Sequence, residues 1–315
     1  MTLAFVSIIS GIALIWISAE KLEKYSVLAA KQFGMSPFLI GSTVIAFGTS
    51  APEMLTTFFV SLENQGAMII GNVIGSNVAN LSLVFGSMLL VLSIQKQNIS
   101  QPKSINKNLV ILLFSSLLVW VVIAIDPFAI TSSIILLISL MAVIYIWYTS
   151  NKEVPEIQDE EASERNLIKL IFSLVALVFA AWLITTGAIL ILDNFNLGQL
   201  FIGYTVLAIG TSLPEIAASV SLALKSRYEA VAGTLIGSNI FNGLCVLAIP
   251  GLFRSNQMAE GWEYSEWSDL LVILFAITLI FITYIFILSK QGRRVSVLLS
   301  ILFLSIYFVS LIYAY

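Results

Sequence analysis

The sequence predicts an all-α polytopic membrane protein whose ten transmembrane helices form two inverted five-helix repeats. Three observations lead to this prediction: a strongly apolar composition, ten apolar segments with short polar breaks, and duplicated motifs at a constant spacing. Of the 315 residues, 59% are hydrophobic and only 10% are charged. A soluble domain has roughly 45–50% apolar and 25% charged residues. A soluble protein of this length would therefore need many more charged residues for its surface.

The ten apolar segments are each about 20 residues long, which is enough to cross the hydrocarbon core of a bilayer. The segment at the N-terminus has no basic region before it and no small-residue cleavage site, so we expect a retained helix rather than a signal peptide. The segments lie near residues 2–19, 37–61, 67–94, 108–125 and 128–148, and then near 167–192, 199–224, 229–253, 268–289 and 295–314.

The only strongly polar stretch, residues 151–166, separates the two sets of segments. We therefore divide the chain into a first repeat (1–150), a linker (151–166) and a second repeat (167–315). The linker has only 16 residues, which leaves no room for a folded regulatory domain.

Two motifs occur once in each set. GSTVIAFGTSAPE (41–53) aligns with GYTVLAIGTSLPE (203–215) at nine of thirteen positions, and GNVIGSNVAN (71–80) aligns with GTLIGSNIFN (233–242). Both pairs are separated by the same 162 residues, so the two sets are copies of one structural unit. Because each copy has five spans, an odd number, the second copy must cross the membrane in the opposite direction. This is the inverted-repeat arrangement of many secondary transporters.

Positive charges are distributed unevenly between the two sides of the predicted bundle. Fourteen of the 15 Lys and Arg residues fall in the loops after spans 1, 3, 5, 7 and 9, and only Arg254 falls on the other side. Cytoplasmic loops carry an excess of Lys and Arg. We therefore expect a multi-pass protein of the cell (inner) membrane, with the linker 151–166 in the cytoplasm and both termini outside.

The composition also excludes several classes of function. The chain has no histidine and a single cysteine, Cys245, which excludes His-based triads, imidazole metal sites, internal disulfides and cysteine zinc clusters. The net charge of −3, with scattered Lys and Arg, gives no nucleic-acid footprint. We expect a protein that is not an enzyme, and the lipid bilayer is the only macroscopic partner that the sequence implies.

Two ionisable residues, Glu53 and Glu215, lie well inside predicted spans at equivalent positions of the two repeats. A charge at mid-membrane costs on the order of 2.5–3.5 kcal/mol, so an intramembrane carboxylate is functional by default. The repeat symmetry should bring both residues to the centre. Two neighbouring carboxylates can both stay ionised there only if a cation is bound between them, and otherwise at least one takes up a proton. Because the central parts of the spans contain no Lys or Arg, the pair suits Ca²⁺, several Na⁺ or protons.

The residues around each glutamate are oxygen donors at helical spacing. Thr49 precedes Glu53 by four residues, as Thr211 precedes Glu215, so each pair should share a helix face. Hard cations such as Ca²⁺ bind six to eight oxygens, and nothing in this set is soft enough for Cu⁺ or zinc thiolate chemistry. The oxygen donors are Thr49, Ser50, Ser76 and Asn80 in the first repeat, and Thr211, Ser212, Ser238 and Asn242 in the second.

Pro52 and Pro214 directly precede the two glutamates. A proline lacks the N–H that would bond the carbonyl four residues earlier, here that of Gly48 or Gly210. A bare carbonyl in hydrocarbon is costly unless it lines a cavity or binds a ligand. We therefore expect broken helices at the ion site.

In this order and in duplicate, the motifs resemble the two α-repeats of the sodium/calcium exchanger family, within the calcium:cation antiporter superfamily. The resemblance is most specific over residues 41–86 and 203–248, and the chain looks like a small prokaryotic-type member. The resemblance implies that Glu53 and Glu215 are central ligands shared by Ca²⁺ and Na⁺. It implies further side-chain ligands at Thr49, Thr211, Ser50, Ser212, Ser76, Ser238, Asn80 and Asn242. It also implies backbone carbonyl ligands at Ala46 and Ala208.

The resemblance implies a secondary active antiporter that exchanges Ca²⁺ for Na⁺ by alternating access and needs no cofactor. Some relatives carry Asp at the position of Asn242, among them those that also move K⁺, so we expect no K⁺ requirement. A Ca²⁺(cation)/H⁺ antiporter remains an alternative, because protons could also discharge Glu53 and Glu215. A passive cation channel is the alternative from another functional class. Spans 1 and 6 are candidates to slide across the remaining bundle.

Overall fold

The computed structural model describes residues 2–32, 37–94, 105–150, 164–195, 198–224, 228–253, 268–287 and 293–315. These residues are helical almost throughout, with short π- and 3₁₀-helical segments and no strand among them. A helix satisfies every backbone donor and acceptor within the segment, which long apolar stretches in a bilayer require. The predicted all-α class is confirmed. Most of the predicted linker, residues 151–163, lies outside the described residues.

The first half of the chain consists of helices that are long relative to their connections. Two of them contain a π-helical segment. The elements are α1 (Thr2–Gln32), α2 (Pro37–Leu39), a π-helical segment (Ile40–Ile45), α3 (Ala46–Leu62), α4 (Gly66–Ala79), a π-helical segment (Asn80–Val84), α5 (Phe85–Ile94), α6 (Ile105–Ile125) and α7 (Ile130–Ser150).

The second half follows the same order, but its second motif helix ends in a 3₁₀ turn rather than in a π-helical segment. The elements are α8 (Glu164–Phe195), α9 (Gln199–Ile202), a π-helical segment (Gly203–Leu207), α10 (Ala208–Leu224), α11 (Tyr228–Leu244), a 3₁₀ turn (Val246–Ala248), α12 (Ile249–Leu252), α13 (Ser268–Ile287) and α14 (Arg293–Ala314).

Seven helices in the described part of the chain are long and apolar enough to cross a membrane. Shorter apolar helices, Thr2–Ser18 and Phe179–Ile191, lie within α1 and α8. The predicted span near 37–61 is helical but is not among the seven, so the count of ten transmembrane helices stays a prediction. The seven are Gly66–Ile94, Ile105–Ile125, Ile130–Thr149, Gln199–Leu224, Ala230–Leu252, Ser268–Ile285 and Val297–Ala314.

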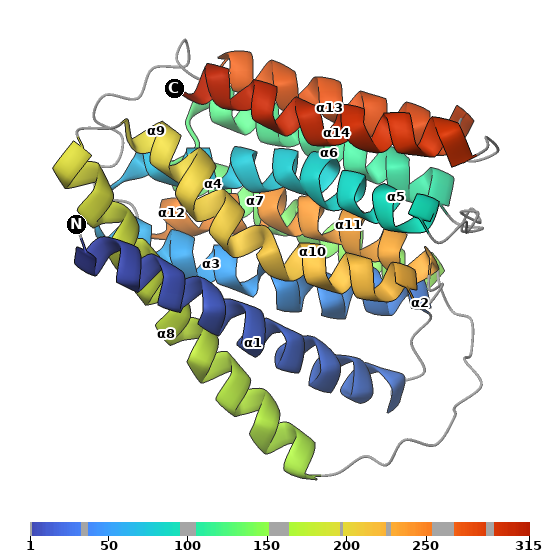
Figure 1. The fold of residues 1–315 in the computed structure, drawn as a ribbon, viewed down its shortest axis with the longest axis horizontal. Coiled ribbons are helices and arrows are strands. Elements are labelled where there is room, and N and C mark those ends of the chain that lie inside the picture. The colour runs from blue at the N-terminus through green and yellow to red at the C-terminus, as the bar shows by residue number, and fades with distance from the viewer. Residues whose placement is uncertain are drawn as a thin grey trace.

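The helices form a bundle in which α3, α4, α10 and α11 lie between two outer groups (Figure 1). On one side α13 and α14 cover the centre, and on the other α1 and α8 pack against each other. Helix α1 also packs on α10, and α8 packs on α3. Both chain ends lie at the same end of the bundle (Figure 1). The four central helices, which carry the duplicated motifs, are thus enclosed by the others.

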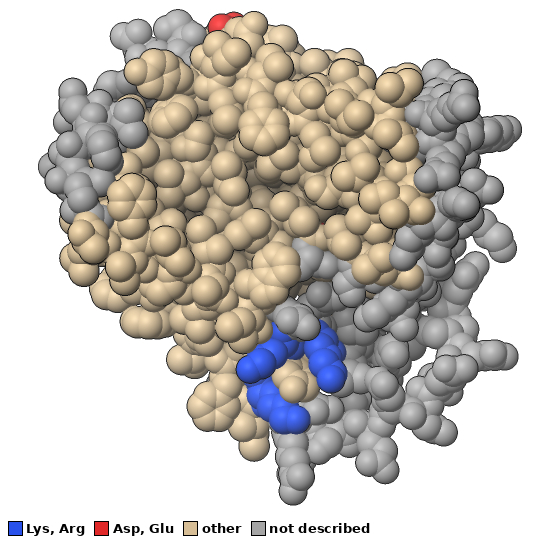
Figure 2. Space-filling model, in the orientation of Figure 1, with Lys and Arg blue, Asp and Glu red and all other residues tan. Residues whose placement is uncertain are grey.

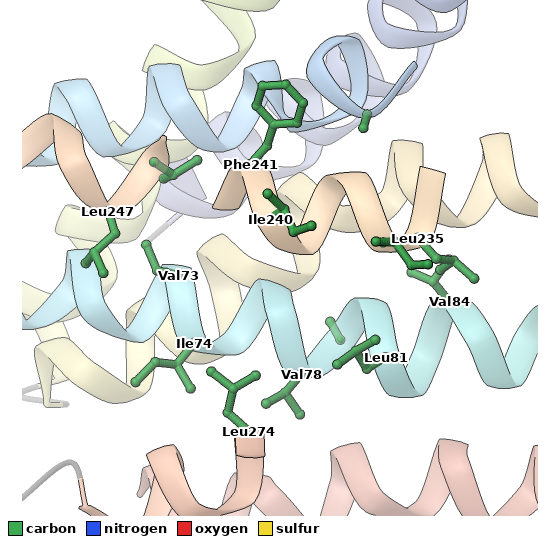
Figure 3. Packing of buried hydrophobic residues seen from close by; sticks show 14 of the residues in the cluster. Val73, Ile74, Val78, Leu81, Val84, Leu235, Ile240, Phe241, Leu247 and Leu274 are labelled. Carbon is green, nitrogen blue, oxygen red and sulfur yellow. The ribbon is translucent and has the colours of Figure 1, made fainter. Parts of the chain in front are cut away.

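An apolar layer holds the central helices in place. In Figure 3, Ile74 and Val78 of α4 lie over Leu274 of α13, while Ile240 and Leu247 lie on the opposite side of α4. All five side chains are at most 3% exposed. Because lipid tails are as apolar as these side chains, close packing rather than hydrophobic burial must hold the helices together.

Two glycines allow α4 and α11 to approach the other half of the chain closely. A Cβ atom at Gly75 would lie 2.8 Å from the backbone oxygen of Tyr204, and one at Gly237 would lie 2.5 Å from the backbone oxygen of Ser42. Gly75 and Gly237 are 162 residues apart, as are Ser42 and Tyr204. The contacts are therefore reciprocal: the second motif of each half packs on the first motif of the other half.

Candidate cation site

Helices α3 and α10 bring Glu53 and Glu215 to the centre of the bundle, where each side chain is 1% exposed. The hydroxyl of Ser212 lies 3.5 Å from Oε1 of Glu53, and the hydroxyl of Ser50 lies 3.5 Å from Oε1 of Glu215. Each carboxylate therefore accepts a long hydrogen bond from the opposite half. The two carboxylates also interact electrostatically with each other. No Lys or Arg of the described residues forms an ion pair with either of them.

Several oxygens at the centre have no hydrogen-bond partner among the described residues. They include Oε2 of both Glu53 and Glu215, and the amide groups of Asn80 and Asn242. The hydroxyl of Ser76 also has no hydrogen-bond partner among the described residues. Since nearly all buried polar groups in proteins are hydrogen-bonded, unpartnered oxygens from two carboxylates, two amides and a serine require an explanation. They are the hard donors that Ca²⁺ and Na⁺ prefer.

The threonines link the two motifs further. The hydroxyl oxygens of Thr49 and Ser238 are 3.3 Å apart, which joins α3 to α11. Thr211 donates to the backbone oxygen of Leu207 at 3.0 Å. Thr211 also interacts with the carboxylate of Glu53, as Thr49 does with that of Glu215.

The structure places all the predicted site residues in the interior. Each of them is at most 1% exposed. Contacts bring Thr49 and Ser50 together with residues of the other half, whereas no hydrogen bond links Asn80 or Asn242 to the glutamates. The buried residues are Ala46, Thr49, Ser50, Glu53, Ser76 and Asn80, with Ala208, Thr211, Ser212, Glu215, Ser238 and Asn242.

The prediction of broken helices at Gly48 and Gly210 was wrong. Helix α3 continues through Pro52 and α10 continues through Pro214. The irregularity lies directly before each helix, in the π-helical segments Ile40–Ile45 and Gly203–Leu207.

A π-helical segment shifts the hydrogen-bond register without interrupting the helix. The backbone N–H of Ala46 reaches the oxygen of Gly41, and that of Ala208 reaches the oxygen of Gly203, five residues earlier in each case. Such π-helical turns occur often at functional sites, because they release a carbonyl from its α-helical partner. The backbone next to Ala46 and Ala208 is therefore irregular because of a π-helical segment, and not because of a break before the proline.

Four further buried polar residues, which were not predicted from the sequence, lie one helical turn from the predicted ligands. Their spacing could have identified them. Two of them follow a glutamate by four residues, and the other two precede a motif serine by four residues. These residues are Thr57, Asn72, Ser219 and Thr234.

The chain is similar to known proteins over nearly its whole length. The family described as sodium/calcium exchanger protein matches residues 3–150 and 166–315. An uncharacterized membrane protein of Methanocaldococcus jannaschii is 32% identical over 308 residues, covering 96% of this chain and 94% of its own. A sodium/calcium exchanger of Methanosarcina acetivorans is 24% identical, covering 90% of this chain and 99% of its own. A solved sodium-calcium exchanger structure aligns with a TM-score of 0.72 at 28% identity, covering 98% of each chain.

Proposed function

The chain belongs to the sodium/calcium exchanger family, and from this premise we propose that it exchanges Ca²⁺ for Na⁺ across the cell membrane as a secondary active antiporter. The observation that carries the proposal is the pair of buried carboxylates, Glu53 and Glu215, each in contact with a serine of the opposite half. Two ionised carboxylates give the site a charge near −2, which one Ca²⁺ or several Na⁺ would balance. Ca²⁺ and Na⁺ are the cargo, and they occupy the site in turn.

The ligands in this proposal are the twelve buried residues of the candidate cation site. The unpartnered second oxygens of Glu53 and Glu215 and the amide oxygens of Asn80 and Asn242 support it, because they are free to coordinate a cation. The serine and threonine hydroxyls add further hard oxygen ligands. These neutral ligands suit Na⁺, which carries a smaller charge than Ca²⁺.

The same proposal includes ten transmembrane helices in two inverted repeats, 1–150 and 167–315. In Figure 1, α3 runs from α2 at the right end toward the left, whereas α10 runs from α9 at the left end toward the right. The reciprocal packing of Gly75 and Gly237 is what a two-fold axis between the repeats would produce, since each contact then occurs twice.

Alternating access would be driven by the state of the carboxylates. An empty site is doubly negative and costly to occlude in a low-dielectric interior, whereas a loaded site is neutral. Helices α1 and α8 are the elements that we propose to move. A Cβ atom at Gly11 would lie 2.6 Å from Ile184, and one at Gly187 would lie 2.6 Å from Ile8, so the two helices cross in close contact and could slide as a pair.

We place the termini outside and the connection between the repeats in the cytoplasm. Figure 2 shows Lys and Arg side chains gathered over α1 and α8, away from the end where the chain termini lie in Figure 1. In this region the ammonium group of Lys169 lies 5.4 Å from the centre of the Tyr25 ring. The gathering of positive charge supports a cytoplasmic location for this part of α1 and α8.

The experiment that tests the function is uptake of ⁴⁵Ca²⁺ into proteoliposomes that contain the purified protein. We expect an outward Na⁺ gradient to drive Ca²⁺ accumulation above equilibrium. Accumulation driven only by an outward proton gradient would contradict Na⁺ coupling and establish the cation/H⁺ antiporter. Uptake that only runs down the Ca²⁺ gradient, with neither counter-ion, would establish the channel.

Acid should inhibit transport. Protons compete with cations for the oxygens of Glu53 and Glu215, and one bound proton removes half of the charge that attracts Ca²⁺. We expect initial Na⁺-driven Ca²⁺ uptake to fall by about an order of magnitude between pH 8 and pH 5, as the balance shifts toward protonated carboxylates. Initial rates at fixed gradients over this range measure the effect. Rates that are independent of pH would argue against carboxylates as the central ligands.

The two serines that contact the glutamates should matter equally. Replacing Ser50 or Ser212 by Ala removes the hydroxyl that lies 3.5 Å from a carboxylate of the other repeat. A hydrogen bond contributes about 0.5–1.5 kcal/mol, so we expect the half-saturating Na⁺ concentration to rise about two- to tenfold in either variant. The matched control is Thr278→Val, which removes a buried hydroxyl in α13. A large effect for only one serine would contradict the reciprocal arrangement.

A further inference from the structure

Beyond each glutamate lies a second group of buried polar residues that the proposed ligand set does not use. In the first half the group consists of Thr57 on α3 and Asn72 on α4, and in the second half of Ser219 on α10 and Thr234 on α11. All four side chains are 0% exposed. Apolar residues would fill these positions more cheaply in a membrane protein, because an unsatisfied polar group in hydrocarbon costs several kcal/mol.

The two groups occupy equivalent places along the helices. Thr57 follows Glu53 by four residues, so it lies one turn, or about 6 Å, further along α3. It lies five residues before the end of α3 at Leu62, and Asn72 lies six residues after the start of α4 at Gly66. The first group therefore lies between the central site and the turn that joins α3 to α4.

The second group shows the same spacing on α10 and α11. Ser219 follows Glu215 by four residues and lies five before Leu224, while Thr234 lies six residues after Tyr228. Since α3 and α10 run in opposite directions in Figure 1, their C-terminal ends lie at opposite ends of the bundle. The two groups thus flank the central site on opposite sides.

The polar atoms of both groups are incompletely bonded. The amide nitrogen of Asn72 donates to the hydroxyl of Thr57 at 3.3 Å, but the amide oxygen of Asn72 has no partner in the described part of the chain. The hydroxyl of Thr56, next to Thr57 and also 0% exposed, has none either. The same holds for the hydroxyls of Ser219 and Thr234. Unpartnered buried oxygens on both sides of the site call for a ligand that is present only part of the time.

We propose that the two groups are staging sites at which a partly hydrated Na⁺ or Ca²⁺ pauses between the central site and each face of the membrane. The inference rests on the proposed exchange function and extends it to residues outside the proposed ligand set. The staging sites contain only neutral oxygens, whereas the central site has two carboxylates. A neutral set binds a cation weakly enough to release it, while it replaces part of the water shell that the cation loses on the way in.

The two staging sites are not identical. The site near the α3–α4 turn has an amide and an internal hydrogen bond, whereas its counterpart has two hydroxyls that are not bonded to each other. The hydrogen bond from the Asn72 amide nitrogen leaves the Asn72 amide oxygen and one lone pair of the Thr57 hydroxyl available to a cation.

Accessibility from each side of the membrane tests the proposal. Cys245 is the only cysteine, so Cys245→Ser gives a background without thiols, into which Thr57→Cys or Ser219→Cys is introduced. The probe is a small cationic thiol reagent that does not cross membranes, trimethylammonium-ethyl methanethiosulfonate, added to right-side-out or inverted membrane vesicles. We expect Thr57→Cys to react at least tenfold faster from one side and Ser219→Cys at least tenfold faster from the other. Saturating Ca²⁺ should slow both reactions.

The matched control is Thr278→Cys in the same background. Thr278 is 0% exposed, lies in the middle of α13 and bonds to the backbone oxygen of Leu274, so it should not react from either side. If both test cysteines react from the same side, or react no faster than Thr278→Cys, the proposal is overturned. The reaction does not require transport, so a failure of Na⁺-driven Ca²⁺ uptake in the unmodified protein is a separate result.

Sided kinetics give a second test that needs no cysteine. Asn72→Leu should raise the half-saturating Ca²⁺ concentration about fivefold at one face and less than twofold at the other, and Thr234→Val should do so at the opposite face. Thr278→Val should change neither value. Equal changes at both faces in both variants would mean that these residues support only the central site, which would also overturn the proposal.

Discussion

Replacing Glu53 or Glu215 by Gln should reduce Na⁺-driven Ca²⁺ uptake at least about a hundredfold, equivalent to about 2.8 kcal/mol at 1.4 kcal/mol per factor of ten. Gln keeps the shape and one oxygen but removes half of the charge that balances Ca²⁺. Both residues are buried at 1% exposure, without an ion pair in the described part of the chain, so no other charge can compensate. Initial rates of ⁴⁵Ca²⁺ uptake in proteoliposomes measure the loss.

Two controls separate charge from general damage. Glu63→Gln changes an exposed glutamate directly after α3, and uptake should stay within twofold of the unmodified protein. Glu53→Asp keeps the charge and should retain more uptake than Glu53→Gln. If Glu53→Gln and Glu215→Gln both transported Ca²⁺ at the normal rate, the two-glutamate site would be wrong.

Replacing Gly75 or Gly237 by alanine should disturb the close packing between the two halves of the molecule. A Cβ atom at Gly237 would lie 2.5 Å from the backbone oxygen of Ser42 and 2.7 Å from Cβ of Ala46, and backbone atoms cannot move aside cheaply. Overpacking of a close interface costs about 1–3 kcal/mol. We expect Gly237→Ala to lower the free energy of unfolding by this amount and to lower transport at least tenfold, because Ser238 would no longer reach Thr49.

Gly75→Ala should behave in the same way, because its Cβ would lie 2.8 Å from both the backbone oxygen of Tyr204 and Cβ of Ala208. The measurements are thermal unfolding in detergent and uptake in proteoliposomes. Gly198→Ala is the matched control, because a Cβ there would meet no atom within 4 Å. Normal stability in both test variants would show that the halves do not meet at these glycines.

The sequence was sufficient to predict the helical class and the burial of the motif residues. Long apolar runs leave the backbone no alternative to helix in a bilayer. The constant spacing of 162 residues between the copies predicted that Glu53 and Glu215 would come together, and the contacts from Ser50 and Ser212 agree with it.

Other features could not be predicted from the sequence. A proline removes one hydrogen bond, but the sequence alone does not show whether the helix breaks there or adjusts earlier through a π-helical segment, because neighbouring helices decide which backbone groups find partners. The repeat alignment also conceals differences between the halves. Tyr204 stands where the first half has Ser42, and its hydroxyl donates to Ser310 of α14 at 2.7 Å, a contact that depends on how α14 packs.

Competition between Na⁺ and Ca²⁺ for one pocket is the central claim, and calorimetric titration of Ca²⁺ into the purified protein at increasing Na⁺ tests it most directly. We predict that the apparent Kd for Ca²⁺ rises more steeply than the first power of Na⁺ concentration, because several Na⁺ must leave before one Ca²⁺ binds. Glu53→Gln should abolish the Ca²⁺ signal. A Kd for Ca²⁺ that stays constant as Na⁺ increases, in protein that exchanges the two ions, would contradict a shared site.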